Sequence, residues 1–388
     1  MQILSVHNHY QIRGGEDESQ KAEARLLREQ GHQVDVYEEH NDRVSTLSKI
    51  NIASRTIWSR ETYQILTSRF TQQTYDVVHV QNFFPLISPS LYYAAQAKGI
   101  PVVQTLRNYR LLCPNAQFFR QGRVCEDCLE QFIPLPGVVH ACYRGSRAAT
   151  STVAAMLTVH RVMGTWTNQV DIYIALTEFA RQKFIQGGLP AEKIVVKPNF
   201  VHPDPGLGEG GGNYALFVGR LSPEKGLDTL LQAWKKLGSK IPLKIVGDGS
   251  LTSQVSKAVA QISGVEYLGR KPIAEIYKLM GEAAFLVFPS EWYEGQPRTI
   301  LESFAVGTPV IASNLGAMSS LINPYHTGLH FRPGDSEDLT AQVEWVLSHP
   351  TELTQMRQEA RAEFEAKYTA TENYRRLMDI YQKAMDSR

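Results

Sequence analysis

The chain has 388 residues, enough for two or three domains, and 43% of them are apolar while 20% are charged. This composition is typical of a folded globular protein and excludes long disorder. Forty basic residues against 39 acidic ones leave a net charge of +1, which argues against a dedicated nucleic-acid binder. The opening MQILSVHNHY lacks the basic start and apolar stretch of a signal peptide, and no apolar run is long enough to span a bilayer, so we expect a cytoplasmic protein.

Short apolar runs alternate with longer amphipathic runs over the first 200 residues. This alternation predicts parallel strands whose sheet is covered by helices on both faces. We expect strands at 3–8, 34–38, 76–81, 101–106, 171–176 and 194–198, and helices at 16–30, 56–70, 88–98, 147–165 and 178–186.

The same alternation returns in the second half of the chain. Strands are expected there at 214–219, 243–247, 266–269, 285–289, 310–313 and 328–331. Between the halves, HPDPGLGEGGGN (202–213) holds five glycines and two prolines, a composition that ends regular structure and predicts a linker. We therefore predict two Rossmann-like α/β domains, 1–200 and 201–365, joined by a hinge and facing each other across a cleft. A final helix at 366–388 would pack back on the first domain.

One region of the first half is strongly basic. Residues 43–123 hold ten basic side chains and two acidic ones, so we expect this region to face an anionic surface or substrate. Within it, SRTIWSRETYQILTSRF (54–70) has the pattern of a basic amphipathic helix, which can lie on anionic lipid. The alternative is an ordinary domain helix with one buried face.

All four cysteines lie within 30 residues of one another, in an expected insertion near 113–142. Cys125 and Cys128 form a CxxC pair, flanked by Cys113 and Cys142. In a reducing compartment such a set predicts structural zinc rather than disulfides. Disulfides formed on isolation and free structural thiols are the alternatives.

The segment FVGRLSPEKGLDTLL is typical of a strand, a turn and a helix. Arg220 ends the strand and Lys225 stands where the helix begins. Two cations beside free backbone amides predict a diphosphate site. The alternative is that both are solvated surface charges.

A second segment, PSEWYEGQPRTILESFAVGTPVIAS, runs from a strand through an acidic loop into a helix that begins near Pro297. Glu294 in the loop and Glu302 in the helix can accept hydrogen bonds from the hydroxyls of a sugar or ribose. The amides of Thr299 and Ile300, in the first helical turn, can meet a phosphate between them.

Taken together, FVGRLSPEKG, VGDGS and the pair of glutamates separated by seven residues resemble the retaining GT-B glycosyltransferases of family 4. The resemblance covers essentially the whole chain. It implies transfer of a hexose-type sugar from a nucleotide diphosphate sugar, UDP favoured over GDP, with retention of configuration and no metal at the chemical step. It also implies a glycan or lipid-linked acceptor in polysaccharide or glycolipid synthesis, and a possible peripheral contact with the inner face of a membrane.

The resemblance also implies roles for single residues. Arg220 and Lys225 would hold the donor diphosphate, and Glu302 would bind the ribose. The donor sugar would be held by Glu294 and the amide of Gly295. Arg270 and Lys271 would lie beside the nucleobase. Gly14 and Gly15, which have no Cβ, would let the phosphate or the acceptor approach the backbone closely.

One position departs from the family pattern. In the context TLRNY the chain has Arg107 where many relatives have a histidine near the reacting sugar. Arginine cannot act as a base, although it can stabilise the diphosphate or a donor carboxylate. His7 and His9, expected in the loop after the first strand, are alternative histidines. A nucleotide-sugar-binding homologue with impaired catalysis and a GT-B nucleotide-sugar epimerase are the competing functions.

Overall fold

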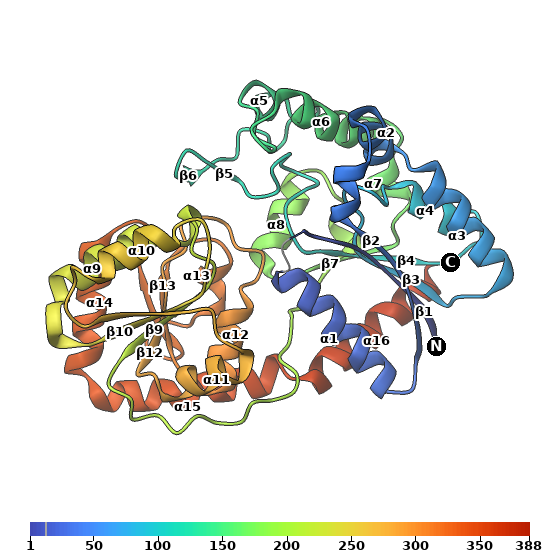
Figure 1. Ribbon diagram of the computed structural model, residues 1–388. Coiled ribbons are helices and arrows are strands. Elements are labelled where there is room, and N and C mark those ends of the chain that lie inside the picture. The colour runs from blue at the N-terminus through green and yellow to red at the C-terminus, as the bar shows by residue number, and fades with distance from the viewer. Residues whose placement is uncertain (12–13) are drawn as a thin grey trace. The chain divides into compact units, whose positions relative to one another are not determined.

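The computed structural model describes residues 1–11 and 14–388, which form two compact α/β units (Figure 1). The first unit consists of residues 1–118, 125–199 and 373–388, and the second of residues 119–124 and 200–372. Each unit contains one six-stranded parallel sheet. The predicted class, two Rossmann-like domains, is therefore confirmed.

The sheet of the first unit has the strand order β2-β1-β3-β4-β7-β8. Its strands, in chain order, are β1 Gln2–His9, β2 Gln33–His40, β3 Val77–Asn82, β4 Val102–Leu106, β7 Ile172–Ala175 and β8 Ile194–Val196. Its helices are α1 Gly15–Glu29, α2 Lys49–Ile57, α3 Arg60–Gln72, α4 Ser90–Gln96, α5 Leu135–Val139, α6 Arg147–Val162, α7 Thr165–Asn168, α8 Glu178–Gln186 and α16 Ala370–Asp386. Two 3-10 turns, Asn41–Thr46 and Ala191–Lys193, complete it.

The C-terminal helix α16 is part of the core of the first unit. Leu377 and Tyr381 of α16 pack with Leu27 of α1 and with inward-facing strand residues such as Ile3 and Val103. Figure 1 shows α1 and α16 side by side against this sheet. Residues separated by roughly 370 positions in the chain therefore share one hydrophobic cluster.

The sheet of the second unit has the order β11-β10-β9-β12-β13-β14. Its strands are β9 Ala215–Val218, β10 Leu243–Val246, β11 Val265–Gly269, β12 Phe285–Phe288, β13 Val310–Ser313 and β14 Gly328–Phe331. The helices are α9 Leu227–Leu237, α10 Thr252–Val259, α11 Ile273–Glu282, α12 Arg298–Ala305, α13 Ala317–Leu321, α14 Ser336–Ser348 and α15 Pro350–Lys367, with 3-10 turns at Pro223–Lys225 and Gly238–Lys240. A short antiparallel hairpin, β5 Phe119–Arg120 and β6 Arg123–Val124, is grouped with this unit.

Alternating residues of the central strands build two separate cores in the second unit. Ala215 and Phe217 of β9 join the cluster that contains α9 and α14. Leu216 and Val218 of the same strand join the cluster that contains α11, α12 and α15. Because side chains alternate along a strand, one uninterrupted apolar run supplies both faces.

The predicted linker, 202–213, has no regular structure, but it is tied along the second unit. The amides of Gly208, Gly210 and Gly212 donate to the carbonyls of Val306, Gly281 and Glu282 at 2.9–3.0 Å. A Cβ on Gly208 would lie 2.3 Å from the Cα of Gly281. The glycines of this segment therefore permit close packing of one backbone against another, rather than serving mainly as points of free rotation.

The prediction of a single helix at 56–70 is wrong, because the helical structure is interrupted at Trp58 and Ser59, between α2 and α3. Ser59 caps α3 by accepting a hydrogen bond from the Thr62 amide at 3.2 Å, and such a cap starts a new helix. Arg55, expected on a lipid-facing side, pairs instead with Glu39 and Glu61. Across the described residues, no helix is both long and apolar enough to cross a membrane.

Candidate functional site

The candidate site of the second unit lies where its sheet changes direction. From β9 the chain continues to β10 and β11 on one side, whereas β12 leads to β13 and β14 on the other. The loops that follow β9 and β12 therefore diverge, and ligands of open α/β sheets bind beyond the carboxyl ends of such neighbouring strands. Arg220 and Lys225 follow β9, and Glu294 follows β12.

Backbone contacts hold these two loops together. The Glu291 amide donates to the Glu224 carbonyl at 2.9 Å. Gly226 has a φ of 68°, and a Cβ on it would lie 1.9 Å from the carbonyl oxygen of Pro289. Only glycine fits this conformation and this space, so the SPEKG turn is shaped to rest against the loop after β12.

The structure brings Lys225 and Glu294 into direct contact. Lys225 Nζ lies 2.6 Å from Glu294 Oε1, and Ser290 Oγ donates to the same oxygen at 2.7 Å. Lys225 Nζ also lies 5.4 Å from the centre of the Trp292 ring. Glu294 is only 7% exposed. The lysine predicted for the diphosphate and the glutamate predicted for the sugar are thus partners of each other.

The other predicted cations lie at the same edge of the sheet. Arg220 is exposed, and within the described part of the chain no carboxylate pairs with its guanidinium. Arg270 is exposed after β11, and Lys271 beside it pairs with Glu275 at 3.2 Å. An unpaired arginine beside a short 3-10 turn can bind an anion with little reorganisation.

Glu302 is a buried carboxylate in α12. Its Oε1 lies 3.4 Å from Nε of Arg298. Burial raises the pKa of Glu302, and Arg298 offsets this only in part. Burial, together with the charge of Glu302, also raises the pKa of Tyr277 to about 12. A buried carboxylate with one long contact retains capacity to accept hydroxyl donors.

The remaining predicted groups lie near the start of α12. Thr299 and Gly295 are half-buried and Ile300 is buried. The Ile300 amide already donates to the Pro297 carbonyl at 3.1 Å. Of the two amides predicted to meet a phosphate, that of Ile300 therefore has a partner within the chain.

In the first unit, Arg107 is buried rather than displayed. Its Nε donates to Gln81 Oε1 at 2.9 Å and its Nη1 to Asn199 Oδ1 at 3.0 Å. A buried ion pair lies beside it, with Lys197 Nζ 2.8 Å from Glu23 Oε2. Burial would raise the pKa of Glu23, but Lys197, with smaller contributions from His79 and Arg107, lowers it to about 2.

His7 and His9 belong to β1, so the expectation that they lie in the following loop is wrong. Their ring nitrogens approach one oxygen of Asp17 at 2.8 and 3.1 Å. The other oxygen of Asp17 accepts the Gly14 amide at 3.0 Å. Burial opposes ionisation of Asp17, but the hydrogen bonds from His7 and Gly14 hold its pKa below the ordinary value.

The glycine pair lies at the start of α1. Gly14 has an extended backbone, and a Cβ on it would meet no described atom within 4 Å. Contacts within the protein therefore do not require glycine at this position, and the space beside Gly14 is open to a ligand. Residues 12 and 13 lie outside the described part of the chain.

Two family models together match most of the chain. Residues 204–363 match the model described as Glycosyl transferases group 1, and residues 20–205 match Glycosyltransferase Family 4. The chain belongs to the group 1 glycosyltransferases. Its fold is the GT-B fold of that family.

Curated relatives are similar in sequence to part of this chain. An uncharacterized glycosyltransferase of Methanocaldococcus jannaschii is 28% identical over 222 residues, which is 57% of this chain and 62% of the relative. The amylovoran biosynthesis glycosyltransferase AmsK of Erwinia amylovora is 28% identical over 231 residues, 55% of this chain and 57% of AmsK. The chain thus spans about three fifths of the length of these two relatives.

Solved structures resemble the group 1 chain over its full length. HepE of Anabaena, in complex with UDP, has a TM-score of 0.70 at 16% identity and covers 98% of this chain and 99% of its own. Sucrose-phosphate synthase of Thermosynechococcus elongatus has a TM-score of 0.72 at 15% identity, with 100% of both chains covered. At this identity the likeness concerns the fold.

The four cysteines, all within the described part of the chain, form no disulfide. Burial, and then the neighbouring Cys113, Cys142 and Cys125, raise the pKa of Cys128 to about 12, so the other three cysteines lie within electrostatic range of Cys128. However, no cysteine belongs to a group of three or more potential ligands among the described residues whose ligand atoms all lie within 4.8 Å of one another. Zinc binding would have to draw the thiols closer, and zinc stays a prediction.

Sequence reasoning missed an acidic cluster beside the glycine pair. Glu16 accepts hydrogen bonds from Asn108 Nδ2 at 3.1 Å and from the Tyr10 hydroxyl at 3.2 Å. Burial raises the pKa of Glu16, against the hydrogen bond from Asn108. A signal for part of this cluster was available, because an acid three residues after Gly14 is the capping-box spacing, which Asp17 fulfils.

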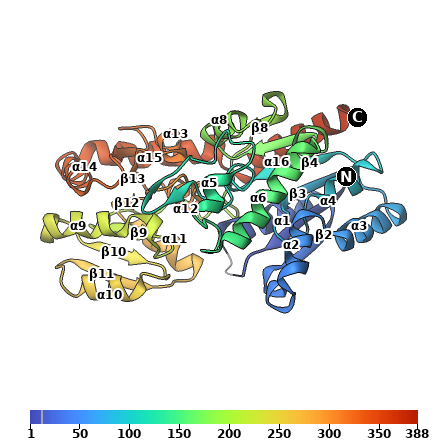
Figure 2. The same cartoon turned by 90° about the horizontal axis from the view of Figure 1, so that it is seen from above.

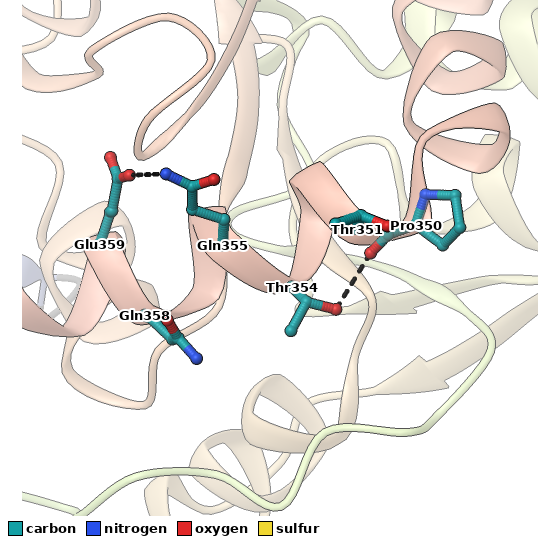
Figure 3. A pocket seen from close by; sticks show the side chains of 6 residues that line it. All are labelled: Pro350, Thr351, Thr354, Gln355, Gln358 and Glu359. Carbon is teal, nitrogen blue, oxygen red and sulfur yellow. Dashed lines mark hydrogen bonds between the residues drawn. The ribbon is translucent and has the colours of Figure 1, made fainter.

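A separate hollow of about 640 Å³ lies along α15 (Figure 3). Gln355 Nε2 donates to Glu359 there at 2.7 Å, and Thr354 Oγ1 donates to the Pro350 carbonyl at 3.0 Å. These polar groups bond along one helix and do not converge on a ligand. The hollow therefore forms no part of the candidate site.

Proposed function

We propose that this chain is a retaining hexosyltransferase that uses a nucleotide diphosphate sugar, with UDP favoured, and a glycan or lipid-linked acceptor. The observation that carries the proposal is the contact of Lys225 with Glu294, with Arg220 on the same loop as Lys225, where the sheet of the second unit changes direction. The likeness to AmsK, an amylovoran biosynthesis glycosyltransferase, supports polysaccharide synthesis, and the likeness to HepE in complex with UDP supports UDP as the nucleotide. We place the reaction in the cytoplasm.

The reaction moves negative charge onto the diphosphate. The bond between the anomeric carbon and the diphosphate oxygen breaks, and an acceptor hydroxyl forms a new bond to that carbon on the same face. The hydroxyl proton passes to the leaving diphosphate oxygen, so no protein nucleophile and no metal is required. Fixed cations beside the developing charge are the largest expected contribution to the rate, and Arg220 and Lys225 are the cations proposed for it.

The contact between Lys225 and Glu294 suggests how the donor is bound. A diphosphate that attracts Lys225 weakens its 2.6 Å contact with Glu294. The carboxylate, still hydrogen-bonded by Ser290, can then accept hydroxyls of the donor sugar. Glu302 would accept the ribose hydroxyls, and Arg270 and Lys271 would border the base. Donor binding and site assembly are thereby coupled through one ion pair.

Screening of nucleotide sugars by thermal shift, followed by assay of nucleoside diphosphate release, tests the proposal. We expect one UDP-sugar to raise the unfolding temperature of the chain. In the presence of an acceptor, UDP should be released from that donor, and a metal chelator should not change the rate of release. Nuclear magnetic resonance of the product decides whether configuration is retained. A sugar that is isomerised without an acceptor would indicate the epimerase instead.

The second candidate is a nucleotide-sugar-binding homologue with impaired catalysis. The observation that favours it is Arg107, which is 7% exposed and bonded to Gln81 and Asn199, at the position where many relatives have a histidine. In the first candidate Arg107 would stabilise the reacting diphosphate or a donor carboxylate. Donor binding with neither hydrolysis nor transfer, over a broad set of acceptors, would establish the second candidate.

A further inference from the structure

Exposed apolar side chains gather in one part of the first unit. Among the described residues, thirteen large apolar side chains are exposed, and seven of them lie between residues 132 and 163. Phe132 is 59% exposed and Val162 is 71% exposed. We call the seven the α5–α6 apolar surface: Phe132, Ile133, Leu135, Val139, Val159, Val162 and Met163. Exposed apolar groups gathered in this way usually mark a contact site.

These residues belong to neighbouring elements. Helix α5 packs against α6, and Figures 1 and 2 both show the two helices side by side. Val159, Val162 and Met163 follow the i, i+3, i+4 spacing that places side chains on one face of a helix. The opposite face of α6, with Val153 and Leu157, is buried.

Beyond Arg147 at its first position, the outward face of α6 lacks the charges of an ordinary solvent-facing helix. Its exposed residues include Ala148, Ser151 and Val159. By contrast, α15 exposes Glu352, Glu365 and Lys367. An outer face with so few charges is unusual for a helix that faces water, because charged and polar residues normally occupy that side.

The charged side chains within the stretch that carries the α5–α6 apolar surface are all basic, and the exposed acids Asp127 and Glu130 directly precede this stretch. No aspartate or glutamate occurs between residues 131 and 170, a stretch that contains three arginines. Arg144 and Arg147 are exposed, and so is Lys49 at the start of α2, a helix that also packs against α6. Cations without nearby carboxylates are attracted to an anionic surface rather than neutralised within the chain.

The loop that carries Phe132 and Ile133 is held in place. The guanidinium of Arg161 in α6 donates to the carbonyl of Phe132 at 2.8 Å, to that of Leu111 at 3.3 Å and to that of Gln131. The apolar side chains are therefore presented by a fixed backbone. Docking then requires little further ordering of this loop.

We propose that the α5–α6 apolar surface docks on an anionic bilayer, with Phe132 and Ile133 entering the interface and Arg144 and Arg147 contacting headgroups. Shallow insertion of apolar side chains flanked by cations is the way peripheral proteins bind anionic lipid. The absence of acids over 40 residues favours lipid over a protein partner, whose surface would offer charges of both signs. This surface replaces the 54–70 segment, whose Arg55 is paired with carboxylates. The proposal extends the lipid-linked acceptor of the proposed function.

Co-sedimentation of the full chain with vesicles tests the docking. Vesicles of phosphatidylcholine with phosphatidylglycerol are compared with vesicles of phosphatidylcholine alone, in the absence of donor. We expect binding to the anionic vesicles, and a loss of about tenfold in F132S/I133S and in R144E/R147E. Ile273→Ser, at a similarly exposed position in the second unit, and R60E/I65S, on α3, are the matched controls and should bind like the parent chain.

The outcomes separate docking from catalysis. Thermal unfolding of every variant checks that it is folded, and transfer to a water-soluble acceptor checks the proposed function independently of vesicles. Equal vesicle binding by F132S/I133S and the parent chain overturns the proposal. A loss of vesicle binding seen only in R60E/I65S also overturns it. So does a parent chain that binds no vesicles but forms a dimer, if F132S/I133S abolishes that dimer.

Discussion

At the carboxyl edge of the sheet in the second unit, Arg220 and Arg270 are exposed, and Lys225 has one carboxylate partner beside the surface. In the first unit, by contrast, Arg107 and Lys197 are 7% and 3% exposed and are bonded within the chain. A cation that already has buried partners stabilises a fold, because removing it leaves an uncompensated group. A cation at a surface loop remains available for a ligand. The same residue types thus serve stability in one unit and, in our proposal, binding in the other.

The largest expected effect is on stability, at the buried pair of the first unit. Lys197→Met leaves Glu23 without its 2.8 Å partner, and breaking a buried pair by removing one member costs about 3–5 kcal/mol. Denaturant unfolding measures the loss. In Glu23→Gln/Lys197→Met both charges are gone, so most of the stability should return. If the double variant is no more stable than Lys197→Met, the pair is not the cause.

The next effect is on turnover, at the exposed Arg220 and the half-buried Lys225 of the second unit. Arg220→Ala and Lys225→Ala should each lower kcat by about 100–1,000-fold, since each removes a cation from the leaving diphosphate. Arg220→Ala should unfold at the temperature of the parent chain, because Arg220 is exposed. The matched variant Arg107→Ala should lose stability. An Arg107→Ala chain that unfolds like the parent but transfers no sugar would break the comparison between the two units.

A pH dependence of stability should sharpen the comparison. Burial, against the pull of Glu23, lowers the pKa of His79 from 6.5 to about 4. Between these values the unfolded chain binds more protons than the folded chain, so stability falls as pH falls through this window. We expect a loss of about 2 kcal/mol between pH 7 and pH 5. Denaturant unfolding of the parent chain and of His79→Gln at both pH values measures this loss. If the stability of His79→Gln depends on pH as strongly as that of the parent chain, His79 is not its cause.

A smaller effect should separate the two glutamates of the second unit. Glu302→Ala should weaken binding of UDP and of the UDP-sugar alike, each by about tenfold, because the ribose is common to both. Glu294→Ala should lower turnover, while affinity for UDP stays the same or rises, since Lys225 is released from its partner. Calorimetry with UDP beside transfer rates decides this. Equal loss of UDP affinity in both variants would show that the roles are not separate.

The zinc prediction concerns composition rather than free energy. We expect about one zinc per chain at Cys113, Cys125, Cys128 and Cys142, measured by elemental analysis of protein purified without added metal. A metal-free, active chain with four titratable thiols would contradict it. That result would leave the raised pKa of Cys128 as the sign of a buried structural thiol.

Local sequence was sufficient for the twelve parallel strands and for the loops that carry Arg220, Lys225 and Glu294. Buried parallel strands are short apolar runs, and loops after them are marked by glycine, proline and charge. The break between α2 and α3 was missed because the apolar spacing continues across Ser59, whose cap overrides it. Only folding decides how alternating strand residues divide between two cores.

The sequence by itself determined the class of fold, the family and the positions of the loops that carry Arg220, Lys225 and Glu294, because each depends on patterns within a few residues. Tertiary structure alone decided which charges meet. Lys225 and Glu294 are 69 residues apart in the chain, and Glu23 and Lys197 are 174 apart. It likewise decided that seven of the large apolar residues between 132 and 163 stay exposed while those of 54–70 are partly covered. Pairing and exposure depend on contacts between distant segments, and local patterns carry no record of those contacts.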